Sequence, residues 1–168
     1  MKYLYILRHA KSSWDDPALS DFERPLNERG RNAAPFMGEV IAKRGYLPDV
    51  VISSPAKRAM ATTTLIKESA GFNAEVKFDD RIYEASPSTL RQVVSEIDDA
   101  SESAMVVGHN PGIEGFIRFL TGRLEPMPTT ALALIKLNVD SWNDIGANLG
   151  EIVEVIRPKE EMKSLGAA

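Results

Sequence analysis

Short apolar runs alternate with helical patterns along most of this chain, and that alternation constrains the fold more than any other feature. The runs that indicate strands are Tyr3–Leu7, Val50–Ile52, Met105–Val107, Leu132–Leu137 and Ile152–Ile156, with a weaker one at Glu75–Phe78. The first and third are nearly continuous in apolar character, which is typical of strands buried on both faces. Alternating strands and helices predict a three-layer α/β/α sandwich with a mostly parallel central sheet.

Helical patterns fill most of the intervals between these runs. They cover Glu28–Lys43, Pro55–Ser69, Ser88–Asp98 and Gly112–Leu120. In the first helix, Asn27 is the expected N-cap and Gly45 the expected stop, while Pro35 predicts a kink or a late start. In the second helix, Ser54 is the expected N-cap, with proline at the first helical position.

Length and composition limit the class of protein. The 168 residues fit one domain, residues 1–168, and 43% of them are hydrophobic, enough for a sizeable core. We expect residues from about 159 to 168 to be a frayed polar tail. A net charge of −4 argues against a nucleic-acid or anionic-membrane binder but leaves room for a local basic pocket.

The same sequence favours the cytoplasm. It contains no cysteine, which excludes disulfides and thiolate zinc sites and suits a reducing compartment. The apolar run near the N-terminus is too short for a signal peptide, and no stretch approaches the roughly 20 apolar residues of a membrane span.

Polar side chains follow four of the predicted strands. They are Arg8 and His9 after the first, Ser53, Ser54 and Arg58 after the second, His109 and Asn110 after the third, and Arg81 and Glu84 after the weak run. In parallel sheets the carboxyl ends of the strands share one edge, where ligands bind. Both histidines of the chain are therefore expected at this edge.

Two arginines, two histidines and a carboxylate are a set suited to phosphoryl transfer. Preorganised cations stabilise the charge on the phosphoryl oxygens, and Arg58 lies in a first helical turn that already favours an anion. A neutral imidazole can attack phosphorus, and a carboxyl group can protonate the leaving atom and then activate water.

Other chemistries are less favoured. Two histidines with Asp15, Asp16, Asp79 and Asp80 could in principle bind zinc or iron, but the arginines would repel a metal cation and no His-x-x-x-His pair exists. Ser53 or Ser54 could be a nucleophile, but no Gly-x-Ser-x-Gly elbow is present and a helix cap explains these serines. Glycine-rich nucleotide-binding motifs are absent, so no cofactor is expected.

Four segments together resemble the histidine phosphatase (phosphoglycerate mutase-like) superfamily. They are Leu7-Arg8-His9-Ala10, Pro25-Leu26-Asn27-Glu28-Arg29-Gly30, Ser53 to Thr63, and Val107-Gly108-His109-Asn110-Pro111, in family order. The resemblance implies a phosphoglycerate mutase-like fold. It also implies that His9 becomes phosphohistidine, that Arg8, Arg58 and His109 bind the phosphoryl oxygens, and that Glu84 is the proton donor.

Ala10 in place of the family glycine, the short length and the segments Lys11–Trp14 and Asp21–Leu26 are similar to the SixA-type branch of phosphohistidine phosphatases. Ser12, Arg24 and Asn110 are possible substrate contacts, although a structural salt bridge from Arg24 to Asp21 is an equal alternative. Glu84 lies just before a helix, which leaves little room for a lid and implies an open site.

Three functions stay open on the sequence. The first is a metal-independent phosphatase acting on protein phosphohistidine, with inorganic phosphate as product. The second is a small-molecule phosphomonoesterase using the same residues, and the third is a non-catalytic phosphate-binding module.

Overall fold

One mixed sheet forms the centre of the structure, a computed structural model that describes residues 1–166. Its strands are β1 (Lys2–Arg8), β2 (Val50–Ser53), β3 (Glu75–Phe78), β4 (Ser103–Gly108), β5 (Leu132–Leu137) and β6 (Gly150–Ile156), in the spatial order β3-β2-β4-β1-β5-β6. The pairs β3–β2, β2–β4 and β4–β1 are parallel, whereas β5 is antiparallel to both of its neighbours. The sheet is therefore mostly parallel, as predicted, with β5 as the reversed strand.

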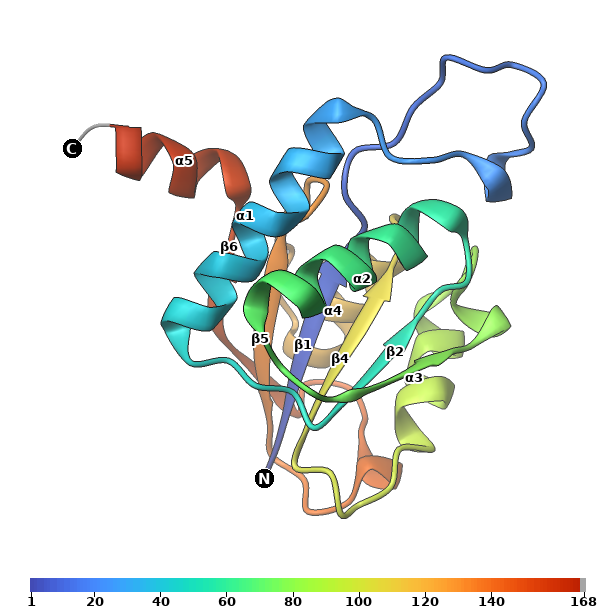
Figure 1. Cartoon of the computed structure of the whole chain (residues 1–168). Coiled ribbons are helices and arrows are strands. Elements are labelled where there is room, and N and C mark those ends of the chain that lie inside the picture. The colour runs from blue at the N-terminus through green and yellow to red at the C-terminus, as the bar shows by residue number, and fades with distance from the viewer. Residues whose placement is uncertain (167–168) are drawn as a thin grey trace.

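Helices cover both faces of this sheet (Figure 1). On one face lie α1 (Glu28–Arg44) and α2 (Lys57–Ala70), whose Met37, Ile41 and Ile66 pack in a core with Leu7. On the other lie α3 (Pro87–Ser95) and α4 (Gly112–Thr121), which form a second core with Ile6. Successive residues of a strand point to opposite faces, so β1 supplies both cores. The predicted three-layer sandwich is confirmed.

The helix ends follow their capping residues, with two differences from expectation. The Asn27 side chain accepts a hydrogen bond from the Gly30 N–H at 2.9 Å, and Gly45 ends α1 in the left-handed conformation. Helix α1 continues through Pro35, so a late start there is wrong. Helix α2 begins at Lys57 rather than at residue 55, and Ser54 is not its N-cap.

The expected frayed tail is also wrong over most of its length. Residues Pro158–Gly166 form α5, which lies beside α1 in Figure 1, while residues 167 and 168 fall outside the described part of the chain. Glu161 of α5 pairs with Arg44 of α1 at 3.1 Å, which ties this helix to the body of the protein. Within residues 1–166, no helix is both long and apolar enough to cross a bilayer.

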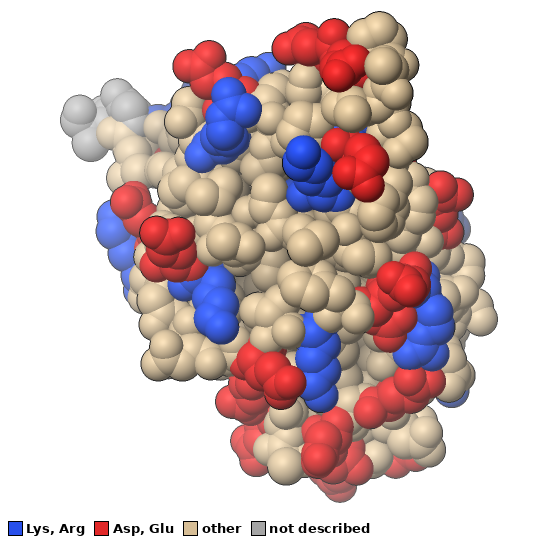
Figure 2. All heavy atoms as spheres, turned by 45° about the vertical axis from the view of Figure 1, so that its right-hand side comes forward, with Lys and Arg blue, Asp and Glu red and all other residues tan. Residues whose placement is uncertain are grey.

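Surface charges are largely mixed in sign. Figure 2 shows basic and acidic side chains in neighbouring groups, separated by uncharged surface, on the face that it presents. Several are true ion pairs, such as Arg81 with Asp79 at 2.8 Å and with Glu96 at 2.7 Å. A place where cations gather without acidic partners would therefore be a departure from the general pattern.

Candidate active site

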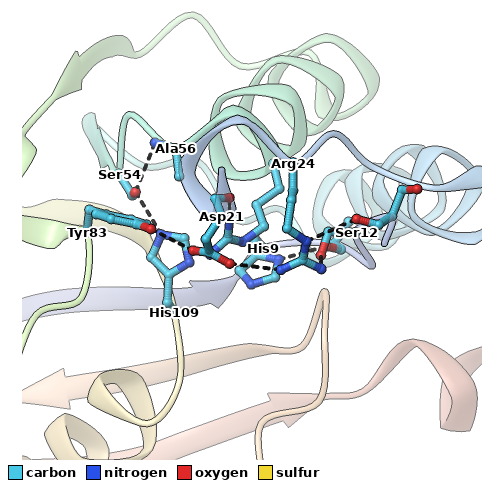
Figure 3. A network of polar contacts seen from close by, with 11 residues as sticks. His9, Ser12, Asp21, Arg24, Ser54, Ala56, Tyr83 and His109 are labelled. Carbon is cyan, nitrogen blue, oxygen red and sulfur yellow. Dashed lines mark hydrogen bonds and ion pairs between the residues drawn. The ribbon is translucent and has the colours of Figure 1, made fainter. Parts of the chain in front are cut away.

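Four side chains meet at the carboxyl edge of the sheet, and we refer to Arg8, His9, Arg58 and His109 as the site floor. Arg8 ends β1, His109 directly follows β4, and Arg58 lies in the first turn of α2, after β2. The His9 N–H donates to the Gly108 carbonyl at 3.1 Å, which joins the ends of β1 and β4. The two imidazole rings lie with centroids 5.0 Å apart (Figure 3). The structure thus brings these four residues together as the parallel topology predicted.

His9 is held in one tautomer by its own backbone. Its Nδ1 lies 2.7 Å from the Ala10 carbonyl, which can only accept, so Nδ1 carries the hydrogen and Nε2 has a free lone pair. Burial lowers the pKa of His9 to about 3, with further lowering from His109 and Arg58. The imidazole is therefore neutral at physiological pH, and its free Nε2 is competent as a nucleophile.

His109 is oriented by Ser54. Its Nε2 lies 2.7 Å from the Ser54 hydroxyl, whose oxygen also accepts a hydrogen bond from the Ala56 N–H at 3.2 Å. Burial, and next the charge of Arg58, lower the pKa of His109 to about 4. The Ser54 hydroxyl therefore contacts an imidazole instead of capping α2, whose N-cap is Ala56.

The floor has hydrogen-bonding capacity left over. The atoms Arg8 Nε, Arg58 Nε and His109 Nδ1 are buried without a hydrogen-bond partner. Among residues 1–166, Thr130 Oγ1 is the one other buried side-chain atom in this condition. Because buried polar groups are almost always satisfied in folded proteins, three such atoms in one site indicate a place for an anion with several oxygens.

A carboxylate that sequence reasoning did not place in the site lies over this floor. Asp21 belongs to η1 (Asp21–Glu23), in the long loop that Figure 1 shows projecting between β1 and α1. Its Oδ2 lies 3.0 Å from Arg58 Nη2 and accepts a hydrogen bond from the Tyr83 hydroxyl at 2.6 Å (Figure 3). Asp21 thereby links the loop to the floor.

Asp21 stays ionised in this arrangement. The hydrogen bond from Tyr83, followed by those from Arg24 and Arg58, lowers the pKa of the Asp21 carboxyl well below its ordinary value. A carboxylate held so firmly in its charged form is a poor proton donor. It acts instead as a fixed negative charge beside Arg58, at the edge of a cavity of about 790 Å³.

Glu84 lines the same cavity, together with Arg58 and His109. It is exposed and has a φ of 57°, a left-handed conformation that is uncommon for a residue other than glycine. The Ala85 carbonyl packs against Gly112 at the start of α4, where a Cβ would come within 2.2 Å of that oxygen. The absence of a side chain at Gly112 therefore allows the Glu84 segment to lie next to His109. The role of Glu84 as proton donor stays a prediction.

The three possible substrate contacts are occupied within the protein. Arg24 donates to Ser12 Oγ at 2.5 Å and to Asp21 Oδ1 at 3.0 Å, so the alternative of a structural salt bridge is what the structure shows. Its guanidinium also stacks on Trp14, 3.2 Å from the ring centroid. Asn110 lines the cavity, but its amide donates to the Met127 carbonyl at 3.0 Å.

The acidic residues considered as metal ligands do not assemble into a site. Asp79 is paired with Arg81, and Asp15 and Asp16 are exposed on the loop before α1. In the part of the chain that the structure describes, no three histidine, aspartate or glutamate side chains are placed to hold a metal ion together.

Comparison with known proteins identifies the relatives of this chain. The model of the histidine phosphatase superfamily (branch 1) matches residues 4–90. An uncharacterized chloroplastic protein of Arabidopsis thaliana is 31% identical over 156 residues, 88% of this chain and 72% of that protein. An uncharacterized protein of Mycobacterium tuberculosis is 29% identical over 160 residues, 88% of this chain and 96% of that protein.

Solved structures resemble the whole fold. SixA from Agrobacterium tumefaciens superposes with a TM-score of 0.81 at 27% identity, covering 94% of this chain and 98% of that one. The protein histidine phosphatase SixA in complex with tungstate gives a TM-score of 0.78 at 19% identity, covering 95% and 99%. The second likeness is one of fold.

Proposed function

Because this chain belongs to the histidine phosphatase superfamily, we propose that it hydrolyses protein phosphohistidine through a covalent intermediate on His9. The observation that carries the proposal is a neutral, buried imidazole with a free Nε2, in a site where buried nitrogens of Arg8, Arg58 and His109 have no hydrogen-bond partner. A nucleophile and a set of oxyanion donors are what phosphoryl transfer requires.

In the first step the His9 Nε2 lone pair attacks phosphorus, and the bond from phosphorus to the leaving atom breaks. The floor arginines and His109 stabilise the charge on the non-bridging oxygens. A leaving alkoxide or imidazole takes up a proton from Glu84, a carboxyl group on the cavity wall.

In the second step water attacks the phosphorus of phosphohistidine. The proton of that water passes to the carboxylate of Glu84, and the bond from phosphorus to Nε2 breaks. His9 regains its lone pair and inorganic phosphate leaves. The positive charge for both steps comes from arginine side chains, so we expect chelators to leave the rate unchanged.

Two features support a protein substrate. SixA from Agrobacterium tumefaciens, assigned to the phosphohistidine phosphatases, matches nearly the full length of this chain. Only two residues separate Glu84 from the start of α3, so no inserted lid follows this side of the cavity. A phosphorylated imidazole presented on a protein surface could then reach the floor.

The absence of cysteine fits a reducing compartment, and we propose that the protein acts in the cytoplasm.

The same floor also serves a small phosphomonoester, and the cavity of about 790 Å³ has room for one. A comparison of kcat/KM values distinguishes a protein substrate from a small phosphomonoester. A phosphorylated histidine-carrying domain and phenyl phosphate are compared by kcat/KM; preference for the domain supports the proposal, whereas efficient hydrolysis of the ester with an untouched domain contradicts it.

Rapid-quench labelling tests the mechanism directly. The enzyme is mixed with a ³²P-labelled phosphorylated domain, quenched in alkali, and the acid-labile label is mapped. We expect label on His9 and none in the His9→Ala variant. Turnover without label on His9 would assign the nucleophile elsewhere, and phosphate binding without any turnover would favour a binding module.

A further inference from the structure

A second cavity, distinct from the one lined by Arg58 and His109, lies between the N-terminal half of α1, the start of α5 and the chain just before β5. Its volume is about 370 Å³. Its charged lining residues are Lys11, Arg29 and Lys159, and uncharged Asn32, Thr129 and Thr130 add polar groups. We refer to it as the basic cavity.

The cations of the basic cavity have no acidic partners. Within residues 1–166, Lys11, Arg29 and Lys159 take part in no ion pair. The neighbouring carboxylates of α5 are directed to other residues, since Glu160 pairs with Arg157 and Glu161 pairs with Arg44. In a chain with a net charge of −4, three unpaired cations around one cavity favour an anionic ligand.

An unsatisfied hydroxyl adds independent support. Thr130 lines the basic cavity, is 1% exposed, and its Oγ1 has no hydrogen-bond partner. The other buried side-chain atoms in this condition among residues 1–166 all belong to the floor, where an anion is expected. By the same reasoning, the Thr130 hydroxyl indicates a second place where an acceptor is missing.

The basic cavity is tied closely to the nucleophile. The Thr130 N–H donates to the carbonyls of Arg8 and His9 at 3.1 and 3.0 Å, which holds this residue at a φ of 67°. Lys11 is two residues from His9, so their Cα atoms lie within about 7.6 Å. A single substrate could thus contact the floor and the basic cavity at the same time.

We propose that the basic cavity is a second anion subsite, which binds an acidic group of the same substrate whose phosphoryl group lies on the floor. The shared chemistry is a carboxylate or phosphate a short distance from the transferred group. Its source is either an acidic side chain near the phosphohistidine of a protein or a second acidic group of a small phosphoester. This inference rests on the proposed function and defines its substrate class.

Matched substrates test the subsite. The first pair is phenyl phosphate and 3-carboxyphenyl phosphate; the second is a phosphohistidine peptide with flanking Asp residues and the same peptide with Asn. We expect wild-type kcat/KM to favour the acidic member of at least one pair by about fivefold, the sum of two or three exposed charge interactions. If wild type prefers the acidic member in just one of the two pairs, that pair identifies the source of the acidic group.

The variant Arg29→Gln/Lys159→Gln should bring the preference to within about twofold, through KM, while kcat on phenyl phosphate stays unchanged. Thr130→Val, which keeps the size and β-branching of the side chain, should lower the preference for the acidic substrate in part. The matched control is Lys43→Gln/Arg118→Gln, which removes the same charge from exposed positions on α1 and α4. Lys43 lies about 21 Å along α1 from Arg29. The control should keep the full preference.

Equilibrium binding separates failure of the subsite from failure of catalysis. The Kd values of phenylphosphonate and 3-carboxyphenylphosphonate are measured with wild type and with both double variants, which requires no turnover. If no substrate is hydrolysed but the carboxylate still strengthens binding in a way that depends on Arg29 and Lys159, the proposed function is wrong and the subsite holds. If wild type prefers no acidic ligand, or the preference survives in the variant, the subsite proposal is overturned.

Discussion

The floor and the loop above it are built by opposite means. The floor side chains leave the ends of buried strands or the first turn of a helix, and His9 and Arg58 are both only 6% exposed. The loop residue Asp21 has a side chain that is 48% exposed and is held by the side chains of Arg24, Arg58 and Tyr83. The backbone of the strand ends and of the first turn of α2 therefore positions the floor residues, whereas a network of side chains positions the loop above them.

The two regions also carry opposite charge. Arg8 and Arg58 make the floor cationic. Asp21 accepts hydrogen bonds from both Nη atoms of Arg58, with its backbone oxygen from Nη1 at 2.6 Å and with its carboxylate from Nη2 at 3.0 Å. On the proposed function, an incoming phosphoryl group would compete with Asp21 for Arg58. We therefore expect changes in the floor to lower kcat and changes in the loop to alter phosphate affinity.

The largest effect is expected from His9→Ala. Removing the proposed nucleophile should lower kcat by about 10⁴-fold or more, because the covalent intermediate is proposed to form on His9. The variant should fold normally, since His9 lies at the edge of the sheet and contributes little to either core. Steady-state kinetics and circular dichroism check both statements; a variant that retains most activity would show that the floor is not built around His9.

Arg58→Ala should cost about 10²- to 10³-fold in kcat, comparable to the loss of one oxyanion donor. Arg118→Ala is the matched control, because it removes an exposed arginine from α4 and should leave kcat unchanged. Comparable losses in the two variants would mean that general positive charge, rather than the position of Arg58, supports the reaction.

Glu84→Gln should separate proton donation from charge stabilisation. An alkyl phosphate has a poor leaving group, so its hydrolysis should slow by about 10²-fold, whereas p-nitrophenyl phosphate should change little. The ratio of the two kcat values is the measurement. Equal losses on both esters would assign Glu84 a role in positioning and leave the proton donor unidentified.

Asp21→Asn should have a smaller effect, and it should strengthen phosphate binding rather than weaken activity. Loss of the charge frees Arg58 for phosphate, so the inhibition constant of inorganic phosphate should fall about three- to tenfold. Tyr83→Phe is the companion variant, which removes a hydrogen bond to Asp21 but leaves the Asp21 charge in place. It should change the inhibition constant of phosphate less. Weaker inhibition in Asp21→Asn would show that Asp21 positions Arg58 rather than competes for it.

The contrast between floor and loop also explains what the sequence could predict. Strand ends in a parallel sheet share an edge, so residues next to apolar runs, such as His9 and His109, could be placed together without a structure. Asp21 could not, because its partners Arg58 and Tyr83 are 37 and 62 residues away and no local pattern connects them. Its spacing to Arg24 revealed the one contact that is local, at i and i+3.

Two local errors have physical reasons. Ser54 has the side chain of an N-cap, but its hydroxyl contacts His109 instead, and tertiary contacts overrode the capping preference. Helix α5 was predicted as a tail because of its polarity, although Pro158 at its start and Glu160 and Glu161 in its first turn are helix-start signals. Its Glu161 contacts Arg44, which is 117 residues away in the sequence, so no local sequence pattern could predict this contact.

The smallest expected effect is an absence of titration in the floor. The pKa values of His9 and His109 are lowered to about 3 and about 4 by burial and neighbouring positive charge, so both rings should stay neutral as the pH falls from 8 to 5. The chain has only these two histidines, so two imidazole signals in an NMR titration report on them directly. A midpoint near 6.5 for either ring would mean that the floor is solvated like the loop above it. In the Asp21→Asn variant the pKa of His109 should fall further, since the Asp21 charge raises it. This shift, followed by extending the titration below pH 5, would show that Asp21 affects the floor through its charge.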